Sequence, residues 1–148
     1  MRRGIILTLI AAILSGGIFV SGILVERHWL SGMNQPDAVA PKLVSPMEGA
    51  VLNNGDPSKD ISLIWEFKWS DVRGADQYHL HVVHENRTTP IVNVWVDEPH
   101  HRFLFERGYI GGTERELKGW TWKVRAHVGG QWSRWSAVQS FNVQPPAK

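Results

Sequence analysis

Two histidines stand one residue apart in the segment His79-Leu80-His81, a spacing that puts both imidazoles on the same face of a β-strand. Imidazole nitrogens are common zinc ligands, and His84, His100 and His101 offer further donors. A specific site would need a third ligand beside the pair, and nothing in the spacing of the sequence brings one there. We therefore interpret these histidines as solvated surface residues, and we expect neither a bound metal nor another cofactor.

Sequence patterns of other catalytic sites are missing as well. The chain has no Gly-x-Ser-x-Gly, no phosphate-binding glycine loop and no His-Glu-x-x-His. Glu114 and Glu116 could share a strand face or a loop, but a carboxylate pair in a glycine-rich turn usually serves only solubility. We expect that the protein is not an enzyme, and an enzyme with a histidine-bound metal is kept as a third alternative.

The hairpin segment 120–136 combines tryptophans with cations. Apolar and polar residues alternate in its first half, where the apolar positions are Trp120, Trp122, Val124 and Ala126. This period of two predicts a strand with one face in a core, and a pair of glycines then permits the tight turn of a hairpin. Trp132 and Trp135 follow the turn and could cover the outward Lys123 and Arg125. Each such cation–π contact contributes about 0.5–1 kcal/mol at an exposed site, so we predict that these four residues form a structural ladder.

Similar alternation predicts the strands that must position these residues. We expect further strands at residues 42–44, 63–69, 78–82, 91–96, 102–105 and 138–143. Seven or so short strands separated by turns are typical of a β-sandwich, so the predicted fold class is all-β. The alternation points Tyr78 inward and His79 and His81 outward, and the valines of segment 91–96 leave Trp95 on the outer face.

Two parts of this pattern resemble fibronectin type III domains. The order Val124-Arg125-Ala126, Trp-Ser-x-Trp-Ser at 132–136 and a last strand at 138–143 resembles strands F and G of that fold. In cytokine receptors this signature stacks on arginines of strand F and has a structural role. Segment 69–80, with its Trp, Arg-Gly turn and Tyr, resembles strand B, the following turn and strand C.

The segment Leu117-Lys118-Gly119 resembles the corner that precedes strand F, with Trp120 in the place of the usual Tyr. The resemblance covers roughly residues 42–144 and implies a fibronectin type III-like, or Ig-like, β-sandwich of about seven strands. Because this sandwich hosts many unrelated roles, the resemblance predicts the fold and not the function.

An uncharged run at residues 4–25 predicts one transmembrane helix. It can cross a hydrocarbon core of about 30 Å, which takes roughly 20 helical residues, and Arg2 and Arg3 favour a cytoplasmic N-terminus. A cleaved signal peptide is the alternative, but the lone Ala-x-Ala at 38–40 lies far from the apolar run. We therefore predict an uncleaved anchor. The expected organisation is an anchor at 1–30, a linker at 31–41, the β-sandwich at 42–144 and a disordered tail at 145–148.

Small residues recur at intervals of four within the predicted anchor, at Ala12, Gly16, Gly17 and Ser21. This spacing would let a second helix approach closely. The alternative is that small residues are simply common in membrane helices.

The amino-acid composition excludes several kinds of protein and of partner. The absence of cysteine excludes disulfides and a lipid-modified cysteine anchor, and it suits a bacterial envelope protein better than a disulfide-bonded receptor. From Lys42 onward there are 13 of the 16 basic and 12 of the 14 acidic residues, so this part carries a net charge of only +1. We therefore expect no nucleic-acid partner.

The predicted parities place a set of polar and aromatic residues on one outer sheet face beside the ladder. The candidates for partner binding are Trp95, His79, His81 and His127. An outward tryptophan among cations can anchor a protein interface or stack on a sugar ring, and Trp95 is the best single candidate.

These expectations combine into one functional hypothesis. The chain would be a non-catalytic, single-pass protein of the bacterial cytoplasmic (inner) membrane, with its C-terminal domain periplasmic or extracellular. It would act as an accessory or docking subunit that binds another membrane or envelope protein within a larger complex. The alternative is an envelope module that binds carbohydrate or peptidoglycan.

Overall fold

The computed structural model describes residues 38–146. The predicted anchor, its small residues and most of the predicted linker lie outside the described residues. Within 38–146, no helix has the length and apolar character needed to cross a bilayer. The elements in this range are β1 (Leu43–Ser45), β2 (Ala50–Leu52), η1 (Pro57–Lys59), β3 (Leu63–Trp69), β4 (Ala75–His84), β5 (Val92–Val96), β6 (His100–Phe105), α2 (Glu114–Leu117), β7 (Trp120–Val128), β8 (Gln131–Trp132) and β9 (Gln139–Val143).

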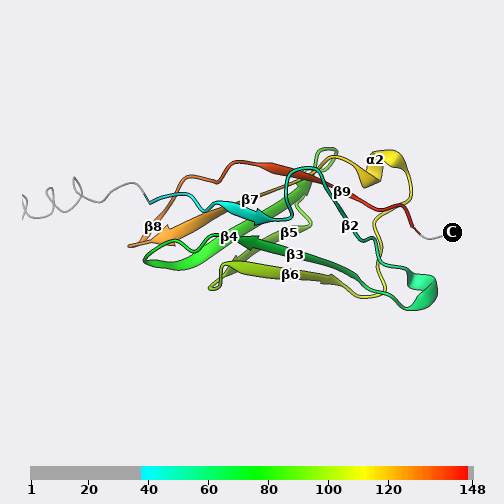
Figure 1. Cartoon of the computed structure of the whole chain (residues 1–148), viewed down its shortest axis with the longest axis horizontal. Coiled ribbons are helices and arrows are strands. Elements are labelled where there is room, and N and C mark those ends of the chain that lie inside the picture. The colour runs from blue at the N-terminus through cyan, green and yellow to red at the C-terminus, as the bar shows by residue number, and fades with distance from the viewer. Residues whose placement is uncertain (1–37, 147–148) are drawn as a thin grey trace, which may run out of the picture. The chain divides into compact units, whose positions relative to one another are not determined.

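The strands form two sheets, so the prediction of an all-β sandwich is confirmed (Figure 1). One sheet has the order β1-β3-β6, and the other has the order β2-β9-β7-β4-β5 with β8 added to β7. All pairings are antiparallel except that of β2 with β9. The segments expected to be strands C, F and G lie together as β4, β7 and β9, apart from the expected strand B, which is β3.

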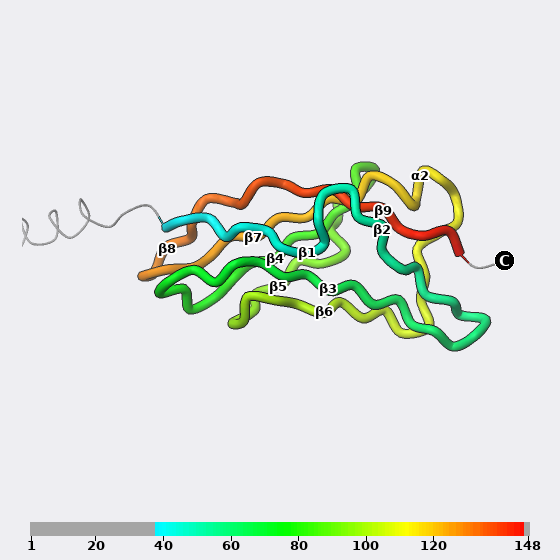
Figure 2. Tube along the Cα trace, in the orientation of Figure 1, coloured from blue at the N-terminus to red at the C-terminus, as the bar shows by residue number. Residues whose placement is uncertain are grey.

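The described part of the chain contains nine strands instead of about seven, because the short β2 and β8 were not predicted. The predicted strand ends agree with the observed ones to within three residues, and the largest difference is at the start of β4. The chain enters the sandwich at the end that carries β8 and leaves it at the opposite end, beside η1 and α2 (Figure 2). The turn between β7 and β8 therefore lies at the end of the sandwich opposite to α2 (Figure 2).

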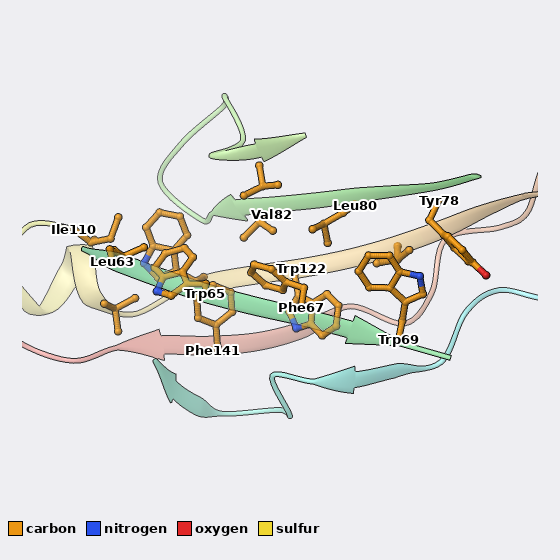
Figure 3. Close-up of a cluster of buried hydrophobic side chains, with 14 of the residues drawn as sticks. Leu63, Trp65, Phe67, Trp69, Tyr78, Leu80, Val82, Ile110, Trp122 and Phe141 are labelled. Atoms are coloured by element: carbon orange, nitrogen blue, oxygen red, sulfur yellow. The ribbon is translucent and has the colours of Figure 1, made fainter. Parts of the chain in front are cut away.

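A layer of aromatic side chains fills the space between the two sheets (Figure 3). Strand β3 contributes Leu63, Trp65, Phe67 and Trp69, each at most 4% exposed. The indole of Trp65 makes edge contacts with Phe141 and with Trp120, at ring-centroid distances of 5.1 and 5.3 Å. Such pairs add about 0.5–1.5 kcal/mol to the hydrophobic gain from their burial. The side chains of β3 and β7 that were predicted to point inward therefore do so.

The corner before β7 is fastened by Trp120. Its Nε1 donates a hydrogen bond to the carbonyl of Glu116, 2.9 Å away, across the corner where the resemblance places a Tyr. Helix α2 brings that carbonyl into position. Glu114 and Glu116 therefore lie on a one-turn helix, and the expectation of a strand face or loop was wrong.

The two carboxylates of α2 have local partners. Oε2 of Glu116 accepts hydrogen bonds from the N and Oγ1 of Thr113, at 3.1 and 2.7 Å. Glu114 pairs with Lys118. These bonds lower the pKa of both carboxyl groups, so both are ionised near neutral pH. Neither carboxyl has the raised pKa expected of a general acid.

Candidate functional site: the outer face of strands β5, β4 and β7

Strands β5, β4 and β7 pair so that their outward side chains form rows across the sheet. Trp95, His79 and Arg125 form one row, as the register of the three strands shows. Asn93, His81 and Lys123 form the next row. We call these two rows, with Trp132 and Trp135 beside them, the outer face. The inward residues between them, Tyr78, Leu80 and Val82, are fully buried, as their predicted parity requires.

The β7–β8 turn folds the chain back along β7. Gly129 and Gly130 both have positive φ, at 58° and 82°, which is the conformation that a two-residue hairpin turn needs and that glycine adopts without strain. Gln131 therefore pairs with Val128, and Trp132 pairs with His127. The turn thus brings the segment of Trp132 and Trp135 beside the outward side chains of β7.

The serines of Trp-Ser-x-Trp-Ser hold this segment against β7. The N–H of Ser133 donates to the carbonyl of Ala126 at 2.7 Å, and Oγ of Ser133 accepts from the N–H of Ala126 at 3.0 Å. Ser136 repeats the pattern with Val124, at 2.8 and 3.1 Å. Each hydroxyl therefore takes the place of the backbone carbonyl that a regular strand would offer. This pairing explains why a serine follows each tryptophan.

The same segment brings the four ladder residues together. The Nζ of Lys123 lies 4.6 Å from the ring centroid of Trp135. The Cζ of Arg125 lies 4.7 Å from the ring centroids of both Trp132 and Trp135. The guanidinium is thus placed between two indoles, and the ring of Trp135 meets two cations. All of these distances are within the range of an attractive cation–π contact.

His79 lies on the outer face but is not solvated, because aromatic rings cover it. It is only 7% exposed, so the expectation of a solvated surface histidine was wrong here. Its ring stacks on Trp95 at a centroid distance of 4.7 Å and an interplanar angle of 18°, and the ring of Trp135 lies 5.0 Å away. Parity places a side chain on a face, but it does not show what covers that face.

Two hydrogen bonds fix the orientation of the His79 ring. Nδ1 accepts from Nε of Arg125 at 3.2 Å, and Nε2 lies 2.6 Å from Oδ1 of Asn93. Because Nε of Arg125 can only donate, the proton of a neutral imidazole must be on Nε2, which then donates to Asn93. This network assigns His79 a structural role beneath Trp95.

Trp95 is 54% exposed even though one face of its ring rests on His79. Its exposure agrees with the predicted outward parity. An exposed indole that is held in one orientation is a surface to which another group could bind with little further ordering. Trp95 is therefore the residue of the outer face best suited to contact a partner.

His81 and Lys123 are half-buried neighbours in the second row. Burial lowers the pKa of His81 below its ordinary value, and the charges of Lys123 and His79 lower it further. The imidazole is therefore mainly neutral at physiological pH. Its nearest ring contact is with Trp135, at 6.2 Å.

His127 lies beyond the two rows and has a partner of its own. Its Nδ1 is 2.6 Å from Oδ1 of Asp76, on β4. Its ring also meets that of Trp132 at 4.9 Å. These contacts place His127 at the end of the ladder, away from Trp95, so it is the candidate least suited to act together with Trp95.

The remaining histidines do not join this site. His84 is 4% exposed, which corrects the expectation that it is solvated. Its Nε2 donates to the carbonyl of Arg115 at 3.0 Å, and its Nδ1 accepts from the N–H of Asn86 at 3.1 Å. His100 and His101 lie on β6, in the other sheet. In the part of the chain that the structure describes, no three His, Asp or Glu side chains are grouped so that they could hold a metal ion.

Sequence reasoning missed two residues that support the site. Asn93 orients His79, and its signal in the sequence is its position two residues before Trp95 on the same face. Asp76 binds His127 across 51 residues of sequence, and no local pattern identifies it. The alternation of residues within a strand can therefore indicate a supporting residue on that strand, but it cannot indicate one on a strand that is distant in the sequence.

Comparisons with known proteins identify similar solved structures. No family model and no curated protein matches the chain. The crystal structure of FN3tt is 16% identical and covers 70% of this chain and 97% of its own, with a TM-score of 0.40. An Fn3-like protein from Clostridium thermocellum is 19% identical, with 76% and 100% coverage and a TM-score of 0.42.

The human OSCAR ligand-binding domain is 15% identical to this chain and has a TM-score of 0.40. The match covers 73% of this chain and 51% of that domain. At these identities and TM-scores, the description of the fold rests on the strand order and register given above.

Proposed function

We propose that this protein is a non-catalytic binding module that docks onto another membrane or envelope protein, as an accessory subunit of a larger complex. In this proposal the helix at 4–25 anchors the chain in a bacterial cytoplasmic membrane, and the β-sandwich lies on the outer side. The observation that carries the proposal is Trp95, which is 54% exposed and yet stacked on the buried ring of His79.

The fixed orientation of Trp95 supports a binding role. A flexible side chain loses about 0.5–1.5 kcal/mol of rotamer freedom when a partner immobilises it. Here His79 already holds the indole, and Asn93 and Arg125 hold His79. Exposed aromatic residues of this kind commonly dominate the binding energy of protein interfaces. The outer face therefore offers a rigid anchor residue in advance of binding.

The membrane helix would supply a second contact in this proposal. Its small residues, Ala12, Gly16, Gly17 and Ser21, suit close packing against a helix of the partner. Two separate contacts on one chain would raise the overall affinity through effective concentration. Loss of one contact is then expected to weaken the complex without abolishing it.

Co-migration in a mild detergent tests the proposal. Native membranes carrying the wild-type chain are solubilised, separated by size, and the chains that travel with this protein are identified by mass spectrometry. We expect the wild-type chain to migrate within a stoichiometric complex and Trp95→Ala to be partly lost from it. A wild-type chain that runs alone at its own mass would show that the proposal is wrong.

Tyr109→Ala is the matched control for this experiment. Tyr109 is also half-exposed, at 50%, but it lies between β6 and α2, away from the outer face. We expect this variant to stay in the complex as the wild type does. Equal losses for Trp95→Ala and Tyr109→Ala would mean that the outer face has no special role.

A carbohydrate or peptidoglycan ligand is the second candidate. One face of Trp95 is covered by His79, and its exposed surface could stack on a sugar ring. A glycan pull-down with the full chain would favour this candidate if retention depended on Trp95 while no protein co-migrated with the chain.

A further inference from the structure

We infer that the partner is an acidic protein segment, whose carboxylate lies against His81 and Lys123 while a neighbouring apolar side chain packs on Trp95. The inference rests on the proposed function and names the chemistry of the partner. Three observations support it: within residues 38–146, His81 and Lys123 have hydrogen-bond donors without acceptors, the outer face carries positive charge, and its two rows are spaced like alternate residues of an extended peptide.

His81 and Lys123 have donor capacity that the fold does not use. They are direct cross-strand partners on β4 and β7, and both are half-buried. Among residues 38–146, neither makes a hydrogen bond or an ion pair, and their contacts are with the ring of Trp135. A lysine ammonium carries three N–H donors, and a protonated imidazole carries two. A carboxylate at this point could accept from both side chains.

Other nitrogen groups near Trp95 are already engaged. His79 is bound by Asn93 and Arg125, and His127 is bound by Asp76. The second row therefore has free donors, on His81 and Lys123, whereas the nitrogen groups of the first row hold Trp95 in place. The free donors and the exposed indole lie in neighbouring rows, so one ligand could contact both.

The outer face has no carboxylate to balance its cations. Its two rows and the two ladder tryptophans contain Lys123 and Arg125 but no Asp or Glu. The nearest acidic residues in the sequence lie beyond the two rows: Asp76 and Asp97 past the row of Trp95, and Glu85 four positions after His81, beyond the end of β4. Burial lowers the pKa of His81, and the like charge of Lys123 lowers it further, as a cation in the second row would. Charge complementarity thus favours an anionic group.

The spacing of the rows suits an extended peptide. Successive residues on one face of a strand are about 7 Å apart, and neighbouring strands are about 4.8 Å apart. Trp95 and Asn93 are two residues apart on β5, so the rows of Trp95 and His81 have this separation. An acidic residue two positions from an apolar residue in an extended segment has the same separation on one face. The partner is therefore expected to present the pattern acidic-x-apolar.

Protonation of His81 would accompany binding. The groups that face its ring are Lys123 on β7, Asn93 on β5, His79 on its own strand and Trp135. An arriving carboxylate would favour the protonated imidazole, because opposite charges raise the pKa of a histidine. Binding should therefore take up a proton and strengthen as the pH falls from about 7.5 to about 5.5, where a glutamate is still ionised.

A titration followed by NMR tests the inference. The probe is the peptide N-acetyl-Glu-Thr-Phe-amide, added to the full chain in a zwitterionic detergent, and the Gln-Thr-Phe and Lys-Thr-Phe peptides are its controls. We expect the Glu peptide to shift the indole N–H signal of Trp95 and the ring signals of His81. Its affinity should exceed that of the Gln peptide by about fivefold, as for one partly exposed ion pair.

Two variants assign the effect to the second row. In His81→Asn, the preference for the Glu peptide over the Gln peptide should shrink, and the affinity for the Glu peptide should no longer depend on pH. The Trp95 signal should still respond to the peptide. His100→Asn changes an exposed histidine of the other sheet, and here the preference and the pH dependence should stay as in the wild type. His81→Asn leaves the core and the ladder intact, so a loss of folding is not expected to obscure the result.

Three outcomes would overturn the inference. If Trp95 responds equally to the Glu and Gln peptides, the carboxylate is not recognised, although Trp95 remains a contact and the proposed function stands. If chitotetraose shifts Trp95 and no peptide does, the ligand is a glycan. If no probe shifts either residue, the outer face does not bind this chemistry, and the co-migration experiment still decides the proposed function separately.

Discussion

Arg125 donates a hydrogen bond through Nε to Nδ1 of His79, over 3.2 Å. The same guanidinium lies between the indoles of Trp132 and Trp135, and the same imidazole lies beneath Trp95. One hydrogen bond therefore joins the cation–π ladder to the exposed tryptophan. A change at Arg125 should therefore alter the environment of Trp95, which lies in the same row of side chains.

Arg125→Ala should destabilise the sandwich and also disturb Trp95. The substitution removes two cation–π contacts and the hydrogen bond to His79, and we expect the free energy of unfolding to fall by about 2 kcal/mol. Arg125→Lys keeps a cation and should lose less. Denaturant unfolding measures the stability, and the indole N–H signal of Trp95 reports the disturbance.

The control for this pair is Arg102→Ala, because Arg102 is an exposed arginine of the other sheet. We expect its stability to stay within about 0.5 kcal/mol of the wild type. An unchanged Trp95 signal in Arg125→Ala would contradict the coupling between the ladder and Trp95.

Ser133→Ala should cost stability because it leaves a buried backbone donor without an acceptor. Oγ of Ser133 accepts from the N–H of Ala126, and loss of such an acceptor costs about 1–3 kcal/mol. Ser136→Ala should do the same through Val124. Ser58→Ala, at an exposed serine, serves as the control in the same unfolding assay. Stabilities of Ser133→Ala and Ser136→Ala that match this control would argue against the role assigned to the hydroxyls.

The strands that carry the site could be predicted because the pleat imposes a period of two on them. In β3, β4 and β7 this period was long enough to give both the strand and its buried face. Strands β2 and β8, with three and two residues, are too short to show a period. Helix α2 is a single turn, which is too short for an amphipathic pattern.

The site itself was only partly predictable. Parity placed His79, His81 and Trp95 on one face, but the burial of His79 depends on rings from β5, from β8 and from the segment after β8. His84 is buried because the carbonyl of Arg115 reaches it from α2. These contacts depend on the register between distant strands and on the path of the loops. The period-two alternation within a strand predicts neither.

Trp120→Phe should cost more than Trp122→Phe, although both indoles are at most 1% exposed. Nε1 of Trp120 donates to the carbonyl of Glu116, whereas Nε1 of Trp122 is buried and has no hydrogen-bond partner among the described residues. Trp120→Phe removes a hydrogen bond, whereas Trp122→Phe removes a buried donor that has no acceptor within residues 38–146. The expected difference is about 1–3 kcal/mol in the free energy of unfolding. Equal costs would show that the bond at the corner contributes nothing.

Trp95→Ala should leave the domain nearly as stable as the wild type. Its ring is more than half exposed, so we expect a loss of about 1 kcal/mol or less. Trp122→Ala, which empties a core position, should cost about 3–5 kcal/mol in the same thermal or denaturant unfolding experiment. A Trp95→Ala midpoint as low as that of Trp122→Ala would show that Trp95 is part of the core and would undermine its role as a contact residue.

Acidification should weaken the fold through His81 and His101. Burial lowers the pKa of both below the ordinary value of 6.5, with Lys123 and His79 adding to the effect at His81 and His100 at His101. The unfolded chain then binds more protons than the folded chain, so stability is full above pH 6.5 and falls as the pH drops through that value. Unfolding free energies measured between about pH 7.5 and about pH 5.5 should show this slope. His81→Gln and His101→Gln should each flatten it and the double variant most, and a double variant with the wild-type slope would contradict this assignment.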